Sequence, residues 1–210
     1  GKISTRVNYK DGKRNGEFKS FFQEGPLIER GQFKNGKKDG SWQEYYQNGQ
    51  TRTKSTYKNG EKNGLFETYE FGFLAVKENY KEGKKEGLEE RYHRPGKIIS
   101  RINFKNGKRD GKYKSFFKEG SLAEKGQYKN GEKDGSWQKY YQNEQTKTKS
   151  TYKNGKKEGV WEMFYPEGPL AEKGQYKNGE KEGVWESFYQ EGQLKLKQNF
   201  ENGHLEGCGE

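Results

Sequence analysis

The chain is poor in aliphatic residues, in cysteine and in long apolar runs, and each shortage excludes a class of protein. Hydrophobic residues make up 26% of its 210 residues and aromatic residues 15%, which leaves too little leucine, isoleucine and valine for a thick core. A single cysteine, Cys208, excludes an internal disulfide framework and a multi-cysteine metal site. No run approaches the roughly 18 apolar residues of a membrane-spanning helix.

Side chains suited to catalysis are equally scarce. The two histidines, His93 and His204, lie far apart in sequence, and no serine or cysteine nucleophile recurs beside them. Nucleophilic catalysis needs a nucleophile, a base and an orienting group held together. The acidic residues of turns such as KNGEKEG are mixed with lysines, unlike the dense oxygen ligands of a calcium loop. We therefore expect no enzymatic activity, no catalytic or cofactor-binding residue and no metal site.

Glycine, aromatic rings and positive charge dominate what is present. The chain has 30 glycines, 35% charged residues and a net charge of +11. Disordered chains of such charge lack aromatic residues, so the rings predict an ordered protein held together by aromatic packing. The basic excess suits an acidic partner or surface without identifying one. The opening residues, GKISTRVNYK, contain no apolar signal-peptide stretch, and either the cytoplasm or a secreted or surface location remains open.

One motif of the form YKNGKKDG recurs along the whole chain, which indicates a repeat protein. The aromatic residues that begin it are 24 residues apart, except for one interval of 23 around YEFGFL. KSTYKNG at Lys54 recurs at Lys149, so a four-repeat block is duplicated at an offset of 95 residues. We expect one array over 1–210, with a leading strand at 1–9, eight hairpin repeats at about 10–200 and a partial ninth unit or cap at 201–210. The anchor aromatics are Tyr9, Phe33, Tyr57, Tyr80, Phe104, Tyr128, Tyr152, Tyr176 and Phe200.

Asn-Gly pairs between aromatic-rich runs predict β-hairpins. A two-residue type I′ turn needs positive φ at both central residues, which asparagine and glycine tolerate. Placing such turns at Asn35-Gly36 and at Asn48-Gly49 gives strands at 37–47 and 50–58, and these lengths close the period of 24. A helix is excluded because a glycine or turn signal occurs about every 12 residues.

This register predicts which side chains meet across the sheet. Gly40 is expected opposite Tyr57 and Trp42 opposite Ser55, while across the other turn Phe33 is expected opposite Lys38 and Gly31 opposite Gly40. Glycine beneath a ring leaves room for the ring to lie flat. The predicted structural aromatic stripe on one face is Trp42, Tyr46, Tyr57, Trp137, Tyr141, Trp161, Tyr165, Trp185 and Tyr189.

The pattern G-x-W-x-x-Y-Y-x-N-G followed by Y-x-N-G-K-x-x-G resembles the bacterial MORN-2 repeat, a variant of the MORN repeat found in YwqK-family antitoxins. The resemblance covers essentially all of 1–207. It implies an all-β, elongated and twisted single-sheet antiparallel β-meander or solenoid of hairpin repeats. It also implies a non-catalytic scaffold that binds proteins and in some cases lipid headgroups. The sequence departs from the pattern at Glu89 and Gly209, which stand at Trp positions, and at Glu144, which replaces a turn glycine.

Two surfaces of the predicted sheet are candidate binding sites. The Asn-Gly turns of the YKNG type form a basic ridge along one edge, stronger in the first five repeats than in the last four, although lysines there also keep a sheet soluble. The basic ridge is Lys13, Arg14, Lys37, Lys38, Lys84, Lys85, Lys108 and Arg109. The face opposite the stripe offers aromatic residues beside cations, a combination typical of protein interfaces. Its predicted partner-binding residues are Tyr45, Phe116, Tyr140, Phe164, Phe188, Arg52 and Lys54.

A protein partner is the first prediction, in an antitoxin-like or immunity-like role. The alternatives are a secreted or surface adhesion module that binds host protein or glycan, and peripheral binding of anionic lipid through the basic turns. Nucleic acid is disfavoured because acidic residues alternate with the lysines and because the rings pack on glycine. Exposed end strands also allow end-to-end self-association.

Overall fold

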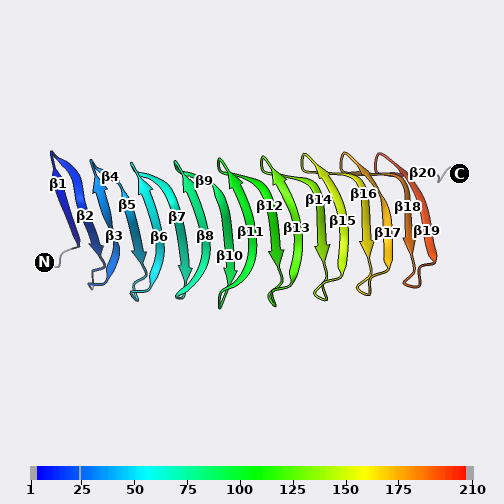
Figure 1. Cartoon of the computed structure of the whole chain (residues 1–210), viewed down its shortest axis with the longest axis horizontal. Coiled ribbons are helices and arrows are strands. Elements are labelled where there is room, and N and C mark those ends of the chain that lie inside the picture. Colours follow the sequence, from blue (N-terminus) through cyan, green and yellow to red (C-terminus); the bar gives the residue numbers. More distant parts are fainter. Residues whose placement is uncertain (1–3, 24, 207–210) are drawn as a thin grey trace. The chain divides into compact units, whose positions relative to one another are not determined.

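The computed structural model describes residues 4–23 and 25–206. It contains 20 β-strands in one antiparallel sheet, and no helix occurs among the described residues (Figure 1). The predicted all-β sheet of hairpin repeats is therefore confirmed. Contacts divide the chain into unit 1, Gly1–Ile98 with Asn103–Lys108, and unit 2, Ile99–Ile102 with Arg109–Glu210. None of the described residues forms a helix that could span a membrane.

Strands that follow each other in the chain pair within each unit, so the topology is a meander of hairpins. The first ten strands are β1 (Thr5–Lys10), β2 (Lys13–Phe21), β3 (Leu27–Lys34), β4 (Lys37–Lys38), β5 (Gly40–Tyr45), β6 (Thr51–Lys58), β7 (Glu61–Glu70), β8 (Phe73–Lys81), β9 (Lys84–Lys85) and β10 (Gly87–His93). The others are β11 (Lys97–Lys105), β12 (Lys108–Phe116), β13 (Leu122–Lys129), β14 (Glu132–Tyr140), β15 (Thr146–Lys153), β16 (Lys156–Phe164), β17 (Leu170–Lys177), β18 (Glu180–Phe188), β19 (Leu194–Glu201) and β20 (His204–Glu206).

The two turns of each repeat differ in geometry. At the first turn, Asn35 and Gly36 have φ of 49° and 82°, as a type I′ turn requires. The prediction of the same turn at Asn48-Gly49 is wrong. There the Tyr46 N–H donates to the Gln50 carbonyl at 2.9 Å, so the loop has three residues, and only its last residue, Gly49, is left-handed with φ of 81°. Three-residue hairpin loops usually end on such a left-handed residue.

The register between β3 and β5 corrects a second prediction. Gly40 lies opposite Tyr57 and Phe33 opposite Lys38, as expected. Gly31 does not lie opposite Gly40, however, because Arg30 is paired with Gln43 and the register has shifted by two residues. The shift occurs where Gly40 adopts a φ of 80°, a β-bulge that also splits the predicted strand 37–47 into β4 and β5. It brings Gly31 level with Trp42.

The shifted register creates the core of the protein, on what we call the indole face. Trp42 lies flat on Gly31, and a Cβ added at Gly31 would come within 2.2 Å of the indole Cδ2. Trp137 lies in the same way on Gly126, and Trp185 on Gly174. These three indoles are 1%, 2% and 3% exposed, whereas most of the chain is at least partly exposed. Glycine at this repeat position therefore makes room for a buried indole.

Each buried indole belongs to a ring cluster closed by a cation. Trp42 packs edge-on against Phe33 at a centroid distance of 5.1 Å and tilted against Phe18 at 5.5 Å. The Lys38 Nζ lies 3.8 Å from the centroid of Trp42, and Lys133 lies at 3.7 Å from Trp137. Such contacts stabilise partly desolvated lysines. The lysine two positions after the turn glycine, Lys38 or Lys133, is therefore a half-buried member of the ring cluster in these repeats.

Hydrogen bonds between successive repeats align both rows of turns. The Gly60 N–H donates to the Lys38 carbonyl at 2.8 Å, and the Asn59 N–H donates to the Asp39 carboxylate at 3.2 Å. The same carboxylate contact recurs at several turns, so these acids hold the next turn in place. At the other turns, the Tyr141 hydroxyl donates to the Phe164 carbonyl at 2.8 Å. Backbone groups at a turn would otherwise depend on water.

Candidate functional site

The face opposite the indoles, which we call the polar face, carries a repeated aromatic–cation pair. Gln43 follows the buried Trp42 in β5 and so points to this face. Tyr45, two residues further, lies beneath the Arg30 guanidinium with Cζ 5.9 Å from the ring centroid. Equivalent pairs recur in which the ring stands 15 positions after the cation. They are Arg6 with Phe21, Lys54 with Tyr69, Lys125 with Tyr140, Lys149 with Phe164, and Lys173 with Phe188.

A polar side chain fixes each tyrosine of this face. The Tyr45 hydroxyl donates to Gln43 Oε1 at 2.6 Å, and the Arg30 guanidinium donates to the same oxygen at 2.6 Å and 2.9 Å. In the next repeat the Tyr69 hydroxyl donates to the Glu67 carboxylate at 2.8 Å. Burial raises the pKa of Tyr69, and the hydrogen bond to Glu67 raises it further. Ring, cation and acceptor thus form one ordered group at Tyr45, Tyr69 and Tyr140, whereas the phenylalanines at this repeat position have no hydroxyl to donate.

The structure places the predicted partner-binding rings at one repeat position, but it gives the two predicted cations other partners. Tyr45, Phe116, Tyr140, Phe164 and Phe188 are all half-buried at the same place in their repeats. Arg52 instead pairs with Glu44 at 3.1 Å, and Lys54 lies over Tyr69 rather than Tyr45. Sequence reasoning missed Tyr69 and, apart from Lys54, the cations that cover the rings. A search for an aromatic residue 15 positions after a lysine or arginine would have found them.

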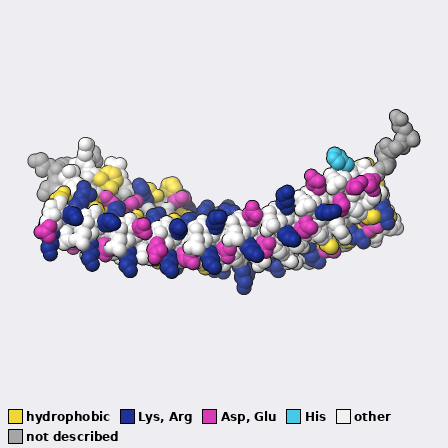
Figure 2. Space-filling view, turned by 90° about the horizontal axis from the view of Figure 1, so that it is seen from above, with side chains coloured by type: hydrophobic (Ala, Val, Ile, Leu, Met, Phe, Trp, Pro, Cys, Tyr) yellow, Lys and Arg dark blue, Asp and Glu magenta, His cyan; other side chains and the backbone are white. Residues whose placement is uncertain are grey.

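The predicted basic ridge is two sets of side chains. The first basic residue of each of its turns is exposed, namely Lys13, Lys37, Lys84 and Lys108. The second set turns toward the indole face, where Arg14 lies over Phe33, Lys38 over Trp42, Lys85 over Phe104 and Arg109 over Tyr128. In Figure 2 acidic side chains are interspersed with the basic ones. Arg14 and Arg109 nevertheless remain exposed and only Lys38 and Lys85 are half-buried, so most of the ridge charges are open to a ligand.

The predicted stripe residues also occupy two places. Tyr57 and the four tryptophans take part in ring–ring contacts on the indole face. Tyr46, Tyr141 and Tyr165 instead donate their hydroxyls to backbone carbonyls one repeat further on. Tyr189 is 48% exposed, with the Lys195 Nζ 5.4 Å from its ring centroid. These tyrosines join successive turns.

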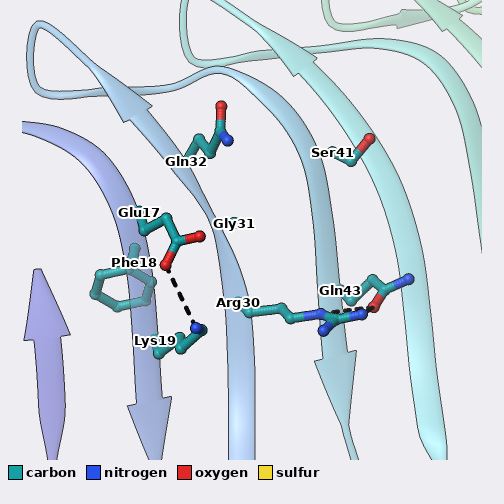
Figure 3. Close-up of a pocket in the computed structure, with 8 residues that line it drawn as sticks. All are labelled: Glu17, Phe18, Lys19, Arg30, Gly31, Gln32, Ser41 and Gln43. Carbon is teal, nitrogen blue, oxygen red and sulfur yellow. Dashed lines mark hydrogen bonds and ion pairs between the residues drawn. The ribbon is translucent and has the colours of Figure 1, made fainter.

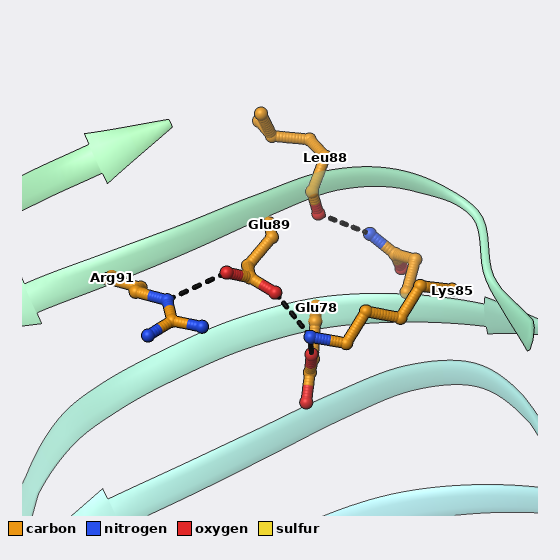
Figure 4. Close-up of polar contacts among 6 residues, drawn as sticks. Glu78, Lys85, Leu88, Glu89 and Arg91 are labelled. Atoms are coloured by element: carbon orange, nitrogen blue, oxygen red, sulfur yellow. Dashed lines mark hydrogen bonds and ion pairs between the residues drawn. The ribbon is translucent and has the colours of Figure 1, made fainter. Parts of the chain in front are cut away.

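In the fourth repeat an ion cluster replaces the indole (Figure 4). Glu89 stands at the Trp position, is 2% exposed and binds Lys85 at 2.5 Å and Arg91 at 2.7 Å. Glu78, at the position of Gly31, binds the same Lys85 ammonium group. Burial by itself raises the pKa of Glu89, but the hydrogen bonds from Lys85 and Arg91 outweigh it and leave the pKa below its ordinary value of 4.5. A half-buried lysine thus bridges two carboxylates.

Shallow hollows open on the polar face above the glycines that support the indoles. The hollow over Gly31 is lined by Glu17, Lys19, Arg30 and Gln43 among others, with Glu17 paired to Lys19 at 3.4 Å (Figure 3). Two hollows of unit 2 lie at the equivalent positions over Gly126 and Gly174. Each has a volume of about 420 to 450 Å³, so each can take a few side chains of another molecule.

The described residues show no arrangement for metal chemistry. Over 4–23 and 25–206, no three His, Cys, Asp or Glu side chains are grouped to hold a metal ion. His93 ends β10, and His204 begins β20 with its side chain exposed. Cys208 and Gly209 lie outside the described residues.

One family model matches the chain repeatedly. It is described as the MORN repeat variant, and its matches cover well over half of the residues, leaving out the short repeat around YEFGFL. The search of curated proteins found no matching relative. The matched segments are 14–35, 38–59, 85–106, 109–130, 133–154, 157–178 and 181–207.

Proposed function

Since this chain belongs to the MORN repeat variant family, whose members are generally non-catalytic and often bind proteins or lipids, we propose that it is a protein-binding scaffold. The observation that carries the proposal is the aromatic–cation pair repeated at one position in successive hairpins of the polar face. In the part of the chain that the structure describes, all strands belong to one sheet, so no second layer covers this face.

The chemistry of these groups favours a protein partner. Tyrosine and arginine supply most of the binding energy at many interfaces because they combine apolar area with polar ends. Here the tyrosine rings are already ordered by neighbouring polar groups, as Tyr45 is by Arg30 and Gln43, so little side-chain entropy is lost when they bind. A binding scaffold of this kind needs no catalytic residue.

An antitoxin-like role and adhesion to a host protein are narrower forms of this proposal, whereas binding of glycan or of anionic lipid is an alternative to it. They differ in the molecule that is bound and in the surface used. Lipid headgroups would use the exposed ridge lysines, such as Lys13 and Lys37, whose attraction is screened by salt. A protein or glycan would use the rings of the polar face.

A capture experiment separates these surfaces. The bait is the whole chain, with one variant carrying Tyr45→Ala, Tyr140→Ala and Phe164→Ala, and a second carrying Lys13→Ser, Lys37→Ser, Lys84→Ser and Lys108→Ser. We expect a discrete protein partner that survives higher salt with wild type and with the lysine variant, and that is lost with the aromatic variant. Circular dichroism checks that both variants are folded.

The opposite pattern would contradict the proposal. If only nucleic acid or anionic lipid is captured, if salt releases it, and if the lysine variant loses it, the exposed turns are the working surface. If the aromatic variant retains every partner of the wild-type chain, the polar face is not the binding face.

A further inference from the structure

The hollow over Gly126 differs from its two counterparts in charge. It is lined by Lys112, Lys114 and Lys125 together with Gln127 and Ser136, and its described lining includes no carboxylate. The hollow over Gly31 has Glu17 at the position equivalent to Lys112, 95 residues earlier. The repeat thus supplies three equivalent places on the polar face, of which this one is purely basic.

In each of the two counterparts a carboxylate of the lining pairs with at least one of the lysines. Glu17 pairs with Lys19 in the hollow over Gly31. In the hollow over Gly174, Glu186 pairs with Lys173 at 3.0 Å and with Lys197 at 3.3 Å. The hydrogen bonds from these two lysines lower the pKa of Glu186, so the carboxylate stays charged.

Two lysines of the basic hollow face each other directly. Lys114 of β12 is the cross-strand neighbour of Lys125 of β13, and like charges at such positions destabilise a sheet. Neither ammonium group forms an ion pair with the part of the chain that the structure describes; Lys125 lies over Tyr140 at 5.5 Å. An anion supplied from outside would remove this repulsion.

We propose that the hollow over Gly126 binds an acidic segment of the protein partner, a short extended run of aspartate or glutamate side chains. This inference rests on the proposed function and names the chemistry of the partner. Lysine ammonium groups are point charges that carboxylates satisfy in many directions, and Gln127 and Ser136 add hydrogen-bonding groups.

The extent of the basic surface favours a short segment over a long polyanion. Gln138 is the next cross-strand neighbour of Lys125, and Lys149 beyond it is paired with Glu162 at 3.4 Å. A nucleic acid strand needs cations that follow its backbone over several phosphates. Only a few adjacent charges are offered here.

Fluorescence anisotropy with a labelled deca-glutamate peptide tests the proposal. Lys112→Glu gives the hollow over Gly126 the carboxylate that Glu17 supplies in the hollow over Gly31. We expect this change to weaken binding of the peptide about tenfold, since it reverses one of three lining charges. Lys125→Gln should weaken binding in the same direction. Glu17→Lys makes the reverse exchange in the hollow over Gly31 and should strengthen binding. Lys37→Glu, the same change of charge at an exposed turn, is the matched control and should change the affinity less than about twofold.

Other outcomes overturn the inference. A deca-glutamine peptide that binds equally well, or an equal loss with Lys37→Glu, would mean that no specific site exists. Duplex DNA or phosphatidylserine vesicles that bind more tightly than the peptide and depend on Lys112 would assign the hollow to another ligand. If the peptide fails to bind while the aromatic variant still loses its protein partner, this inference falls and the proposed function stands. If the peptide binds through Lys112 but no partner depends on the polar-face rings, the proposed function falls.

Discussion

Gly126→Ala is expected to lower the free energy of unfolding by about 3 kcal/mol. A Cβ at this residue would lie 2.2 Å from Cδ2 of Trp137, and the indole is held between Tyr113 and Tyr128 with 2% exposure. The ring must leave its buried place or the strands must separate. Chemical denaturation followed by circular dichroism measures the effect.

The repeat offers a matched control for this prediction. Ser150 stands at the position of Gly126 one repeat later and already carries a Cβ, so Ser150→Ala should cost less than about 1 kcal/mol. Trp137→Ala should make the Gly126→Ala change nearly harmless, because the clash involves that ring alone. Equal losses for Gly126→Ala and Ser150→Ala would contradict the argument that the indole requires glycine.

Glu89→Leu is expected to lower the free energy of unfolding by about 3 kcal/mol, because removing one partner of a buried ion pair leaves other charges uncompensated. Lys85 would keep only Glu78, and Arg91 would lose its partner at 2.7 Å. Restoring the family's residue with Glu89→Trp alone should also destabilise, since Glu78 occupies the place that glycine takes beneath the buried indoles. The double change Glu78→Gly and Glu89→Trp should recover the loss, with Lys85 placed over the new ring as Lys38 is over Trp42.

The pH dependence of stability provides a second readout of the same cluster. Because the pKa of Glu89 is lowered in the folded chain, its contribution is present above its ordinary pKa of 4.5 and is lost as the pH falls through the lowered value. The pKa of Lys85 is raised: burial lowers it, but hydrogen bonds to Glu78 and Glu89 outweigh burial, so its contribution is lost only in strong alkali. The double variant should lose less stability than wild type on acidification. Identical acid profiles would show that the cluster does not contribute.

Most of the fold could be predicted from the period of the repeat. Nine anchor aromatics at one spacing, with Asn-Gly turns between them, identify antiparallel hairpins, because a left-handed pair at Asn35-Gly36 can only be a type I′ turn. Periodicity could not distinguish a two-residue from a three-residue loop at Asn48-Gly49, since both fit the same spacing. It also could not show where the register between two strands shifts, because the shift accompanies the left-handed φ of Gly40, which is a property of the folded backbone.

Less of the candidate site on the polar face than of the fold could be predicted from the sequence. Alternation of side chains placed Tyr45 and Tyr140 on the face opposite the indoles, since this needs only the period of a strand. The cation over each ring comes from the preceding strand, so it depends on the register between strands. For this reason the sequence could not show that Arg52, one of the predicted partner-binding residues, pairs with Glu44.

By itself the sequence determined an all-β repeat of hairpins, the aromatic composition of its core and the absence of aliphatic layers, because these follow from local turn and strand chemistry repeated many times. Only the tertiary structure decided that Gly31 lies beneath Trp42, that Lys38 closes the ring cluster, and that Lys114 faces Lys125. Those contacts depend on how one strand is shifted against the next. A β-bulge near Gly40 accompanies that shift, and its size cannot be read from the spacing of residues along the chain.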